Sequence, residues 1–395
     1  MSDQKKHILF IASWYPSLSA PALGNFIQQH ARAAALHHNV SVVFAHSDAE
    51  LEQGNFVFET KKDENLFEVR VHFTKTKSKI PLISSWKKAE RYRGAMRLGI
   101  DEAIDEHGAP DLVHLHVIWP AALAALPLVD KLRVPLIISE HWSGYLPEDG
   151  NYKGRIMQNF TRRAVARASH VTAVSEKMIE AMRGHGLNNT YSLLPNVVDT
   201  ALFAPAEKTQ PGPGLRLLHV SMLVDREKNI SGLLRVMQKL KEHTDIVLDI
   251  VGEGPERSGF ERMAKQAGVF SQTVFFHGYH DAEGVAEFMQ KADALVLFSH
   301  FEGMPVTIIE AQSCGLPVIA TRTGSIPTMV SEEQGILVSC GDEQALAEAI
   351  MQMKKRKNDF SREAIRHFAE SRYSMDSVGR QLNDLYQNIL GKFGR

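Results

Sequence analysis

Short apolar runs alternate with amphipathic stretches along almost the whole chain, and this pattern constrains the fold more than any other feature. Each run has the length of a buried strand, and the stretches between them, such as residues 230–240, carry apolar side chains at helical spacing. Strands that alternate with helices need crossover connections, which produce a parallel sheet covered on both faces. The exception is residues 54–73, where apolar and polar positions alternate as in a hairpin. The predicted strands are His7–Ala12, Val40–Ala45, Asp111–His116, Pro135–Ser139, His170–Val174, Tyr191–Leu194, Leu215–Ser221, Ile246–Val251, Thr273–Phe276, Ala294–Phe298, Pro317–Ala320 and Gly335–Val338.

The length of 395 residues exceeds that of one ordinary domain. Apolar residues make up 44% of the chain, which is enough to bury two substantial cores. The segment 195–214 is rich in Pro and Gly and lacks periodicity, as is typical of a linker. We therefore predict two doubly wound α/β domains, residues 1–197 and 198–375, with a C-terminal helix at 376–395 packing back on the first. The carboxyl ends of both sheets are expected to face a shared cleft, the usual ligand position in such sheets.

The overall charge and the cysteine content exclude several classes of protein. A net charge of −1 excludes a protein that packages nucleic acid through bulk positive charge, so we expect no nucleic-acid partner. Two cysteines cannot form a disulfide framework or a cysteine-rich metal site. The apolar run at 8–12 predicts a strand in place of a signal peptide, and no apolar window reaches the roughly 18 residues that span a bilayer. The sequence therefore predicts a cytoplasmic protein.

Positive charge is concentrated in residues 75–97, where eight Lys and Arg side chains accompany a single acid, Glu90. Apolar residues, including Trp86, lie among them. Such a segment is either a solvated helix face preceded by a loop or a patch for an anionic acceptor or an anionic membrane surface. The sequence leaves both interpretations open. The second predicts peripheral contact with the inner face of the cytoplasmic membrane.

The segment 298–317 carries the strongest chemical signal. A predicted strand ends at its start, a loop carries Glu302, and Pro305 stands where the first helical turn should begin. The N-terminus of that helix offers free N–H groups and a positive dipole end, which suit phosphate. Glu302 before the helix and Glu310 inside it could hold a sugar and a ribose diol. From the residues alone, a helix-cap partner and a surface acid explain the two carboxylates equally well.

This segment resembles the signature of the family 4 retaining glycosyltransferases, which have the GT-B fold. The resemblance covers most of residues 190–345 in the family's order and is looser in the first half of the chain. It implies two Rossmann-like doubly wound domains facing a central cleft, an N-terminal acceptor domain and a C-terminal nucleotide-sugar domain. The segments that carry it are Pro195-Asn196-Val197-Val198-Asp199, Gly252-Glu253-Gly254-Pro255, Glu302-Gly303-Met304-Pro305, Glu310-Ala311, Cys314-Gly315-Leu316-Pro317-Val318 and Gly335-Ile336-Leu337-Val338.

The resemblance implies roles for residues of the second half. Glu310 is similar to the Glu that holds the nucleotide ribose, and Glu302 to the Glu beside the transferred sugar. Lys228 matches the Lys that neutralises the diphosphate leaving group. The backbone contacts to sugar and phosphate are expected from Gly303, Met304 and Pro305.

One position of the second half departs from the family pattern. An Arg is usual six residues before the Lys, and this chain has Met222 there. An apolar side chain cannot donate hydrogen bonds to phosphate. We therefore hypothesise that Arg226 reaches the donor instead, or that the helix N-termini at Asn229 and Pro305 take more of the charge.

The first half carries fewer matching residues. Gly24 and Asn25 stand where the family has a Gly-Gly pair whose backbone approaches the donor phosphate, and the resemblance implies donor contacts for both. Asn25 departs from the family pattern at the second Gly. Alternation along a strand places His114 and His116 on one face. Two His without a third ligand make a poor metal pair, and the resemblance favours His116 as a contact of the transferred sugar, with a packed core His as the alternative.

Three neighbouring residues follow the next predicted strand, at its carboxyl end. Glu140, His141 and Trp142 are polar or aromatic side chains at the place where an acceptor or a sugar would lie. We predict acceptor-side contacts for them.

The resemblance also implies the reaction. Configuration at the sugar is retained. No cofactor is expected, because the nucleotide-sugar is itself a substrate. No metal ion is expected either, because the chain has no Asp-x-Asp element with the flanking features of a metal-dependent transferase. Lys228 and the helix N-termini would stabilise the charge that grows on the leaving diphosphate. A UDP-sugar is expected as donor ahead of GDP-mannose, and the acceptor is expected to be a glycan or a lipid-linked glycan of cell-surface polysaccharide synthesis.

Three other functions compete with this interpretation, and the first of them fails on its spacing. Gly252-x-Gly254 after a strand favours a dinucleotide-dependent oxidoreductase, but the third Gly of that fingerprint falls on Arg257. A catalytically silent GT-B module that binds a nucleotide fits the loss of Arg at Met222. A sugar-nucleotide epimerase shares the two-domain fold, and the pair of Glu in the segment 298–317 argues against it.

Overall fold

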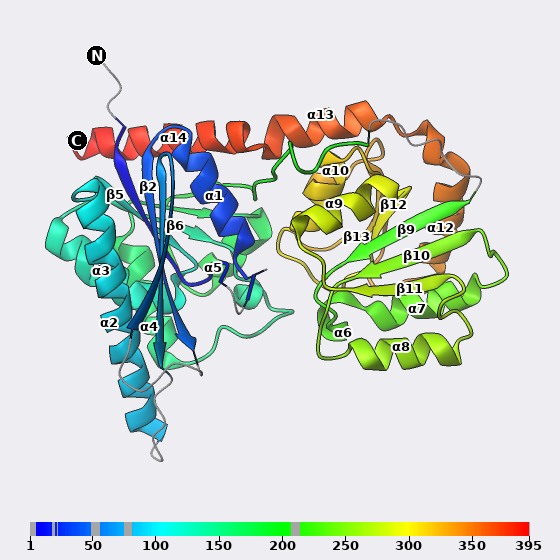
Figure 1. The fold of residues 1–395 in the computed structure, drawn as a ribbon, viewed down its shortest axis with the longest axis horizontal. Coiled ribbons are helices and arrows are strands. Elements are labelled where there is room, and N and C mark those ends of the chain that lie inside the picture. The colour runs from blue at the N-terminus through cyan, green and yellow to red at the C-terminus, as the bar shows by residue number, and fades with distance from the viewer. Residues whose placement is uncertain are drawn as a thin grey trace. The chain divides into compact units, whose positions relative to one another are not determined.

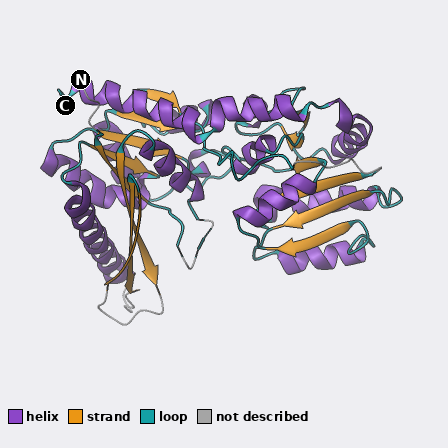
Figure 2. Cartoon of the chain, turned by 45° about the horizontal axis from the view of Figure 1, so that its top comes forward, coloured by secondary structure: helices purple, strands orange, loops and turns teal. Residues whose placement is uncertain are grey.

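The computed structural model describes residues 5–17, 20–21, 23–48, 56–74, 81–206 and 214–394, with the side chains of 81–86 left out. The chain divides into two compact units (Figure 1). The first contains Met1–Val197 together with Met375–Arg395, and the second contains Val198–Ser374. Each unit is a sheet of mainly parallel strands between helices, as Figure 2 shows by the strands in orange and the helices in purple.

The first unit is built on an eight-stranded sheet in the order β3-β4-β2-β1-β5-β6-β7-β8. Only β3 is antiparallel, and it pairs with β4 as the hairpin predicted at 54–73. β4 also pairs in parallel with β2, so the hairpin is part of the main sheet. The strands are β1 His7–Ala12, β2 Asn39–Asp48, β3 Phe56–Asp63, β4 Leu66–Thr74, β5 Leu112–His116, β6 Leu136–Glu140, β7 His170–Ala173 and β8 Tyr191–Leu193.

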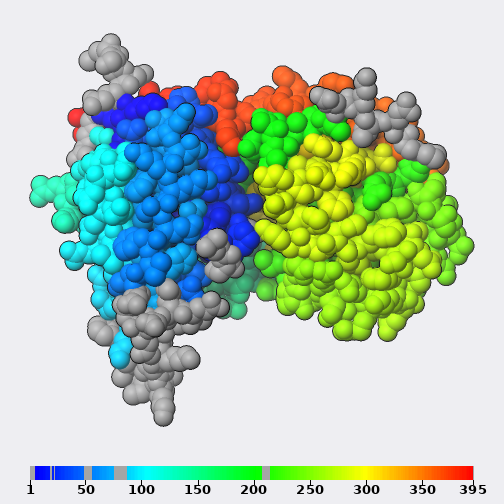
Figure 3. Space-filling view, viewed as in Figure 1, coloured from blue at the N-terminus to red at the C-terminus, as the bar shows by residue number. Residues whose placement is uncertain are grey.

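Helices cover both faces of this sheet. α1 and α14 pack against the face of Phe10 and Val42, and Tyr386 of α14 is fully buried there. α2 covers the opposite face, since Gly99 of that helix lies directly on Val43. The described residues of the first hundred positions form most of the blue surface of this unit in Figure 3. The helices are α1 Asn25–Ala35, α2 Pro81–His107, α3 Ile118–Leu132, α4 Arg155–Arg167, α5 Glu176–Gly184 and α14 Met375–Lys392.

The second unit has six parallel strands in the order β11-β10-β9-β12-β13-β14. The order reverses between β9 and β12, as in doubly wound nucleotide-binding folds. Its strands are β9 Leu215–Val220, β10 Ile246–Val251, β11 Val274–Gly278, β12 Ala294–Leu297, β13 Val318–Thr321 and β14 Gly335–Val338. Its helices are α6 Asp225–Lys228, α7 Ile230–Lys239, α8 Arg257–Gln266, α9 Ala282–Lys291, α10 Val306–Ser313, α11 Ile326–Met329, α12 Glu343–Arg356 and α13 Arg362–Tyr373.

The predicted α/β fold with two doubly wound parallel sheets is confirmed. Every predicted strand is present with small shifts at its ends, and α14 begins at Met375, one residue before the predicted helix. Part of the predicted linker, residues 207–213, lies outside the described residues.

Close backbone packing explains why positions 252 and 254 are glycines. A Cβ on Gly252 would lie 1.9 Å from the carbonyl oxygen of Ser221, and one on Gly254 would lie 2.4 Å from that of Leu223. The loop after β10 therefore passes directly against the loop after β9. This close approach explains the Gly-x-Gly pattern without a dinucleotide.

Candidate active site

The loops after β9 and β12 bring two charged side chains together. Ligands of doubly wound sheets bind where the strand order reverses, outside the carboxyl ends of the strands. Lys228 ends α6, which follows β9, and Glu302 lies in the loop after β12. Lys228 Nζ donates to Glu302 Oε1 at 2.7 Å. The pair is mostly buried, with 18% and 8% of the two side chains exposed.

The neighbouring loop fixes the backbone around Glu302. Ser299 Oγ donates to the same Oε1 at 2.7 Å, and Thr321 Oγ1 donates to the carbonyl of Ser299 at 2.7 Å. Ser325 Oγ donates to the carbonyl of Gly303 at 2.8 Å. Gly324 has φ of 56°, and a Cβ there would lie 2.0 Å from the carbonyl oxygen of Glu302. The carboxylate is therefore held in place before any ligand arrives.

The N-terminus of α10 opens beside this pair. Pro305 is the N-cap residue and α10 begins at Val306, with no side-chain cap and no acid in its first turn. An uncapped N-terminus keeps N–H groups available for an anion.

The N-terminus of α7, which the sequence suggested as a second anion site, has fewer free N–H groups than that of α10. Asp225 Oδ1 accepts from the N–H of Ser231 at 2.8 Å, and Asn229 Oδ1 accepts from the N–H of Gly232 at 3.3 Å. Two of its first N–H groups are thus already paired, and the expectation that this helix takes part of the donor charge needs correction.

Glu310 lies in the second turn of α10, and its carboxylate has no hydrogen bond or ion pair with any described residue. Burial raises the pKa of its carboxyl to about 7. Burial also raises the pKa of the Cys314 thiol to about 12, and the charge of Glu310 adds to that shift. A partly buried carboxylate without a protein partner is suited to accept hydrogen bonds from a ligand.

In the first unit, the two histidines of β5 share one face, as predicted, with ring centroids 4.1 Å apart. His114 makes hydrogen bonds of 2.7 Å to Tyr386 Oη and Ser139 Oγ, so it is a core residue. His116 is fully buried, and neither of its ring nitrogens has a hydrogen-bond partner. Burial holds the pKa of His116 well below its usual range, which keeps the ring neutral. Its predicted contact with a sugar stays a prediction.

The loop after β6 is organised by Glu140. Its carboxylate accepts from the N–H groups of Ile118, His141 and Trp142 at 2.9–3.2 Å, and from Tyr145 Oη at 3.1 Å. Burial raises the pKa of Glu140, and these donors oppose that shift. With four donors and no exposed surface, Glu140 positions the loop, in place of the acceptor contact that the sequence predicted. The acceptor-side roles of His141 and Trp142 stay predictions.

Both halves of the chain match known families. Residues 205–372 match the family Glycosyl transferases group 1, and residues 23–202 match Glycosyltransferase Family 4. The chain belongs to the family 4 glycosyltransferases. TuaC of Bacillus subtilis, a glycosyltransferase whose name refers to teichuronic acid biosynthesis, is 31% identical over 251 residues. That match covers 61% of this chain and only 60% of TuaC. N-acetyl-alpha-D-glucosaminyl L-malate synthase of Bacillus anthracis is 25% identical over 297 residues, which are 71% of this chain and 75% of that protein.

Solved structures share the fold. Sucrose-phosphate synthase of Thermosynechococcus elongatus superposes with a TM-score of 0.78 at 19% identity, over 98% of this chain and all of that one. HepE of Anabaena in complex with UDP gives a TM-score of 0.72 at 17% identity, over 97% of this chain and all of HepE. The GT-B fold expected from the sequence is thereby confirmed.

In this family 4 glycosyltransferase, Met222 is 68% exposed at the carboxyl end of β9, where an Arg is usual. Arg226 is also exposed, and its guanidinium carbon lies 5.8 Å from the centroid of the Phe301 ring. Phe301 directly precedes Glu302, so Arg226 is close enough to the site for its hypothesised role, which stays a hypothesis.

In the first unit, Gly24 has φ of 68°, and a Cβ there would lie 2.6 Å from the backbone of Trp14. A side chain at position 24 is therefore excluded by the protein's own backbone. Asn25 is exposed at the start of α1, which has no side-chain cap.

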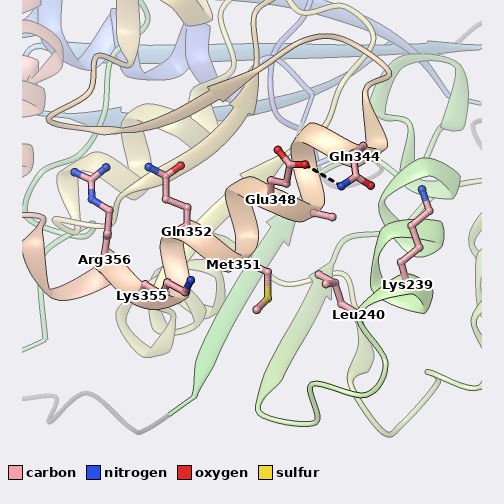
Figure 4. A pocket seen from close by; sticks show the side chains of 9 residues that line it. Lys239, Leu240, Gln344, Glu348, Met351, Gln352, Lys355 and Arg356 are labelled. Atoms are coloured by element: carbon pink, nitrogen blue, oxygen red, sulfur yellow. Dashed lines mark hydrogen bonds between the residues drawn. The ribbon is translucent and has the colours of Figure 1, made fainter.

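The hollow drawn in Figure 4 is not part of this site. It is an open depression at the C-terminal end of α7, where Lys239 and Leu240 face Glu348 and Met351 of α12. Lys228 lies before the other end of α7. Among the described residues, no three or more His, Cys, Asp or Glu side chains are grouped to hold a metal ion. Within the same residues, none of the helices has both the length and the apolar character needed to cross a membrane.

Proposed function

We propose that this protein is a retaining hexosyltransferase that moves a sugar from a nucleotide-sugar to a glycan or lipid-linked acceptor without a metal ion or cofactor. The observation that carries the proposal is the Lys228–Glu302 pair at the reversal of strand order, beside the uncapped N-terminus of α10 and the unpartnered Glu310 of that helix. Lys228 and the free N–H groups of α10 can bind a diphosphate. The carboxylate of Glu310 can bind a ribose.

Each group has a distinct task in the proposed reaction. The ammonium of Lys228 and the first-turn N–H groups of α10 stabilise the charge that develops on the leaving diphosphate. Glu310 accepts hydrogen bonds from the ribose hydroxyls. Glu302 orients the sugar and stabilises positive charge on it. The backbone of residues 303–305 contacts the sugar and the phosphate.

The chemistry needs no protein nucleophile. The acceptor hydroxyl attacks the anomeric carbon from the face that the diphosphate leaves, so configuration is retained. The bond between that carbon and the phosphate oxygen breaks while the new glycosidic bond forms. The departing phosphate oxygen takes the proton of the acceptor hydroxyl, which balances the exchange.

Two comparisons support the choice of substrates. HepE, which shares the fold, was crystallised with UDP and with UDP-glucose, in line with a UDP-sugar donor ahead of GDP-mannose. TuaC is named for teichuronic acid biosynthesis, in line with a glycan or lipid-linked acceptor. A lipid-linked acceptor would call for peripheral contact with the inner membrane face through residues 75–97. Lys87 and Lys88 of that segment are exposed on α2, and residues 75–80 lie outside the described residues.

A thermal-shift panel of nucleoside diphosphates and sugar nucleotides, run with and without EDTA, tests the proposal. Ligands that bind the folded state raise its melting temperature. We expect UDP or GDP and their sugars to stabilise the protein equally in both conditions, and transfer to proceed in EDTA. Stabilisation by a nicotinamide dinucleotide alone, or turnover that requires a divalent ion, would contradict it.

The exposed Met222 in place of the usual Arg favours one alternative, a catalytically silent module that binds a nucleotide. Donor hydrolysis or sugar transfer above the background would exclude that alternative.

A further inference from the structure

Helix α4 of the first unit carries positive charge only. Residues 150–175 contain five basic side chains and no Asp or Glu. Arg167 pairs with Asp130 at 2.9 Å, and the other four make no ion pair with any described residue. All four of these are exposed to solvent: Lys153, Arg155, Arg162 and Arg163.

An apolar group lies within this charge. Ile156 is 70% exposed, more than any other large apolar side chain of the described residues. Phe160, one turn later, contacts Trp119 of α3 with ring centroids 6.0 Å apart. The guanidinium carbon of Arg163 lies 5.9 Å from the centroid of the Phe160 ring. Ile156, Phe160 and Arg163 are spaced at i, i+4 and i+7 and so share one face of the helix. The result is an apolar centre with arginines around it.

This patch begins at the carboxyl edge of the first sheet. α4 follows the β6 connection and runs back toward the start of β7, so Arg155 and Ile156 lie at that edge, and Arg162 and Arg163 lie further along the helix. Trp119 stands three residues after His116, the last residue of β5. α3 packs against both α4 and α2, and Figure 1 shows the three helices along the same part of the unit. On α2, the basic Lys87 and Lys88 are near the N-terminal end, whereas residues 101–106 near the C-terminal end carry four acids. Lys87, Lys88 and Arg155 thus place positive charge at the edge where β5 ends.

We propose that the α4 patch, formed by Trp119, Ile156, Arg155, Arg162 and Arg163, docks the protein on an anionic lipid bilayer. Arginines bind the headgroups, while Ile156 and the edge of Trp119 enter the interfacial region. A soluble polyanion would use the arginines and give the exposed Ile156 no role. The inference deepens the proposed function, because it brings the carboxyl edge of the acceptor-side sheet to the surface where a lipid-linked acceptor resides.

Co-sedimentation of the full chain with vesicles tests the proposal. Phosphatidylcholine vesicles with and without phosphatidylglycerol are compared at low and high salt, with no nucleotide present. We expect binding only to the anionic vesicles and its loss at high salt. Arg162→Gln/Arg163→Gln should weaken partition about 25-fold, since each cation at an anionic leaflet contributes about fivefold. The matched control is Lys241→Gln/Lys355→Gln, which removes two exposed, unpaired lysines from the second unit and should change partition less than twofold.

The variant Ile156→Ser distinguishes binding to a bilayer from binding to a soluble polyanion. It should weaken vesicle binding severalfold and leave binding to heparin unchanged. Unchanged partition of the Arg162→Gln/Arg163→Gln variant, or of Ile156→Ser, would overturn the proposal. Calorimetry on the same preparations measures the binding of UDP or GDP, which reports separately on the second unit. A chain that binds nucleotide but not vesicles refutes only the docking surface, and the reverse result refutes only the proposed function.

Discussion

Replacing Lys228 by Met tests the proposed role of the charged pair. The change removes the ammonium 2.7 Å from Glu302 and leaves a side chain of similar length. Glu302 is 8% exposed and keeps only the hydrogen bond from Ser299, so the folded state loses one charge-assisted hydrogen bond, about 2 kcal/mol. In a unit of this size that lowers Tm by about 4–8 °C. Loss of one preorganised group facing the leaving diphosphate should lower kcat about 10²–10³-fold.

The double variant Lys228→Met/Glu302→Gln distinguishes the two effects. Gln can accept from Ser299 and needs no counter-charge, so Tm should return close to that of the wild type while kcat stays low. Differential scanning calorimetry and steady-state transfer with the best donor of the panel measure both quantities. If Lys228→Met kept the wild-type kcat, or if the double variant regained it, the reasoning about the leaving group would be wrong.

Three further changes probe the surroundings of the pair. The pKa of about 7 at Glu310 lies above its ordinary value of 4.5, so the stability its protonated form provides is full below pH 4.5 and is lost as the pH rises through 7. Glu310→Gln should therefore be more stable than the wild type at pH 8, by up to about 3 kcal/mol, and equal to it at pH 4; equal melting curves at both pH values would refute this. Gly324→Ala should push the loop at Glu302 aside and lower kcat/KM more than tenfold, whereas Gly341→Ala, at φ 74° with open space around the new Cβ, should cost only about 1–2 kcal/mol of stability. Equal activity of the two glycine variants would contradict the close packing of that loop. Arg226→Ala should lower kcat/KM tenfold or more, in keeping with about 1.5–3 kcal/mol for a charged hydrogen bond, and unchanged kinetics would remove Arg226 from the site.

The fold was predictable because periodicity along the chain reports burial directly. The strand at 246–251 has the predicted bounds, and the hairpin at 54–73 was visible from its alternation. The sequence did not predict that β4 of this hairpin also pairs in parallel with β2. Such a pairing depends on contacts between distant segments, which leave no local pattern.

The site was predictable only in part. Lys228 and Glu302 lie 74 positions apart, and the family resemblance, not any local pattern, placed both at one site. Ser299 and Gly324, which fix the loop of Glu302, carry no motif and emerge only from the folded backbone. Glu140 was assigned to the acceptor because a carboxylate at a strand end is typical of a ligand site. The four donors that converge on it come from α3, the loop and Tyr145, a set that sequence spacing cannot show.

A crystal structure with the nucleoside diphosphate that stabilises the protein most is the most direct test of the central claim. The account predicts phosphate oxygens within hydrogen-bond distance of Lys228 Nζ and of the first N–H groups of α10, and ribose hydroxyls against the carboxylate of Glu310. A nucleotide bound elsewhere on the chain, with the Lys228–Glu302 pair unchanged and no ligand beside α10, would contradict it.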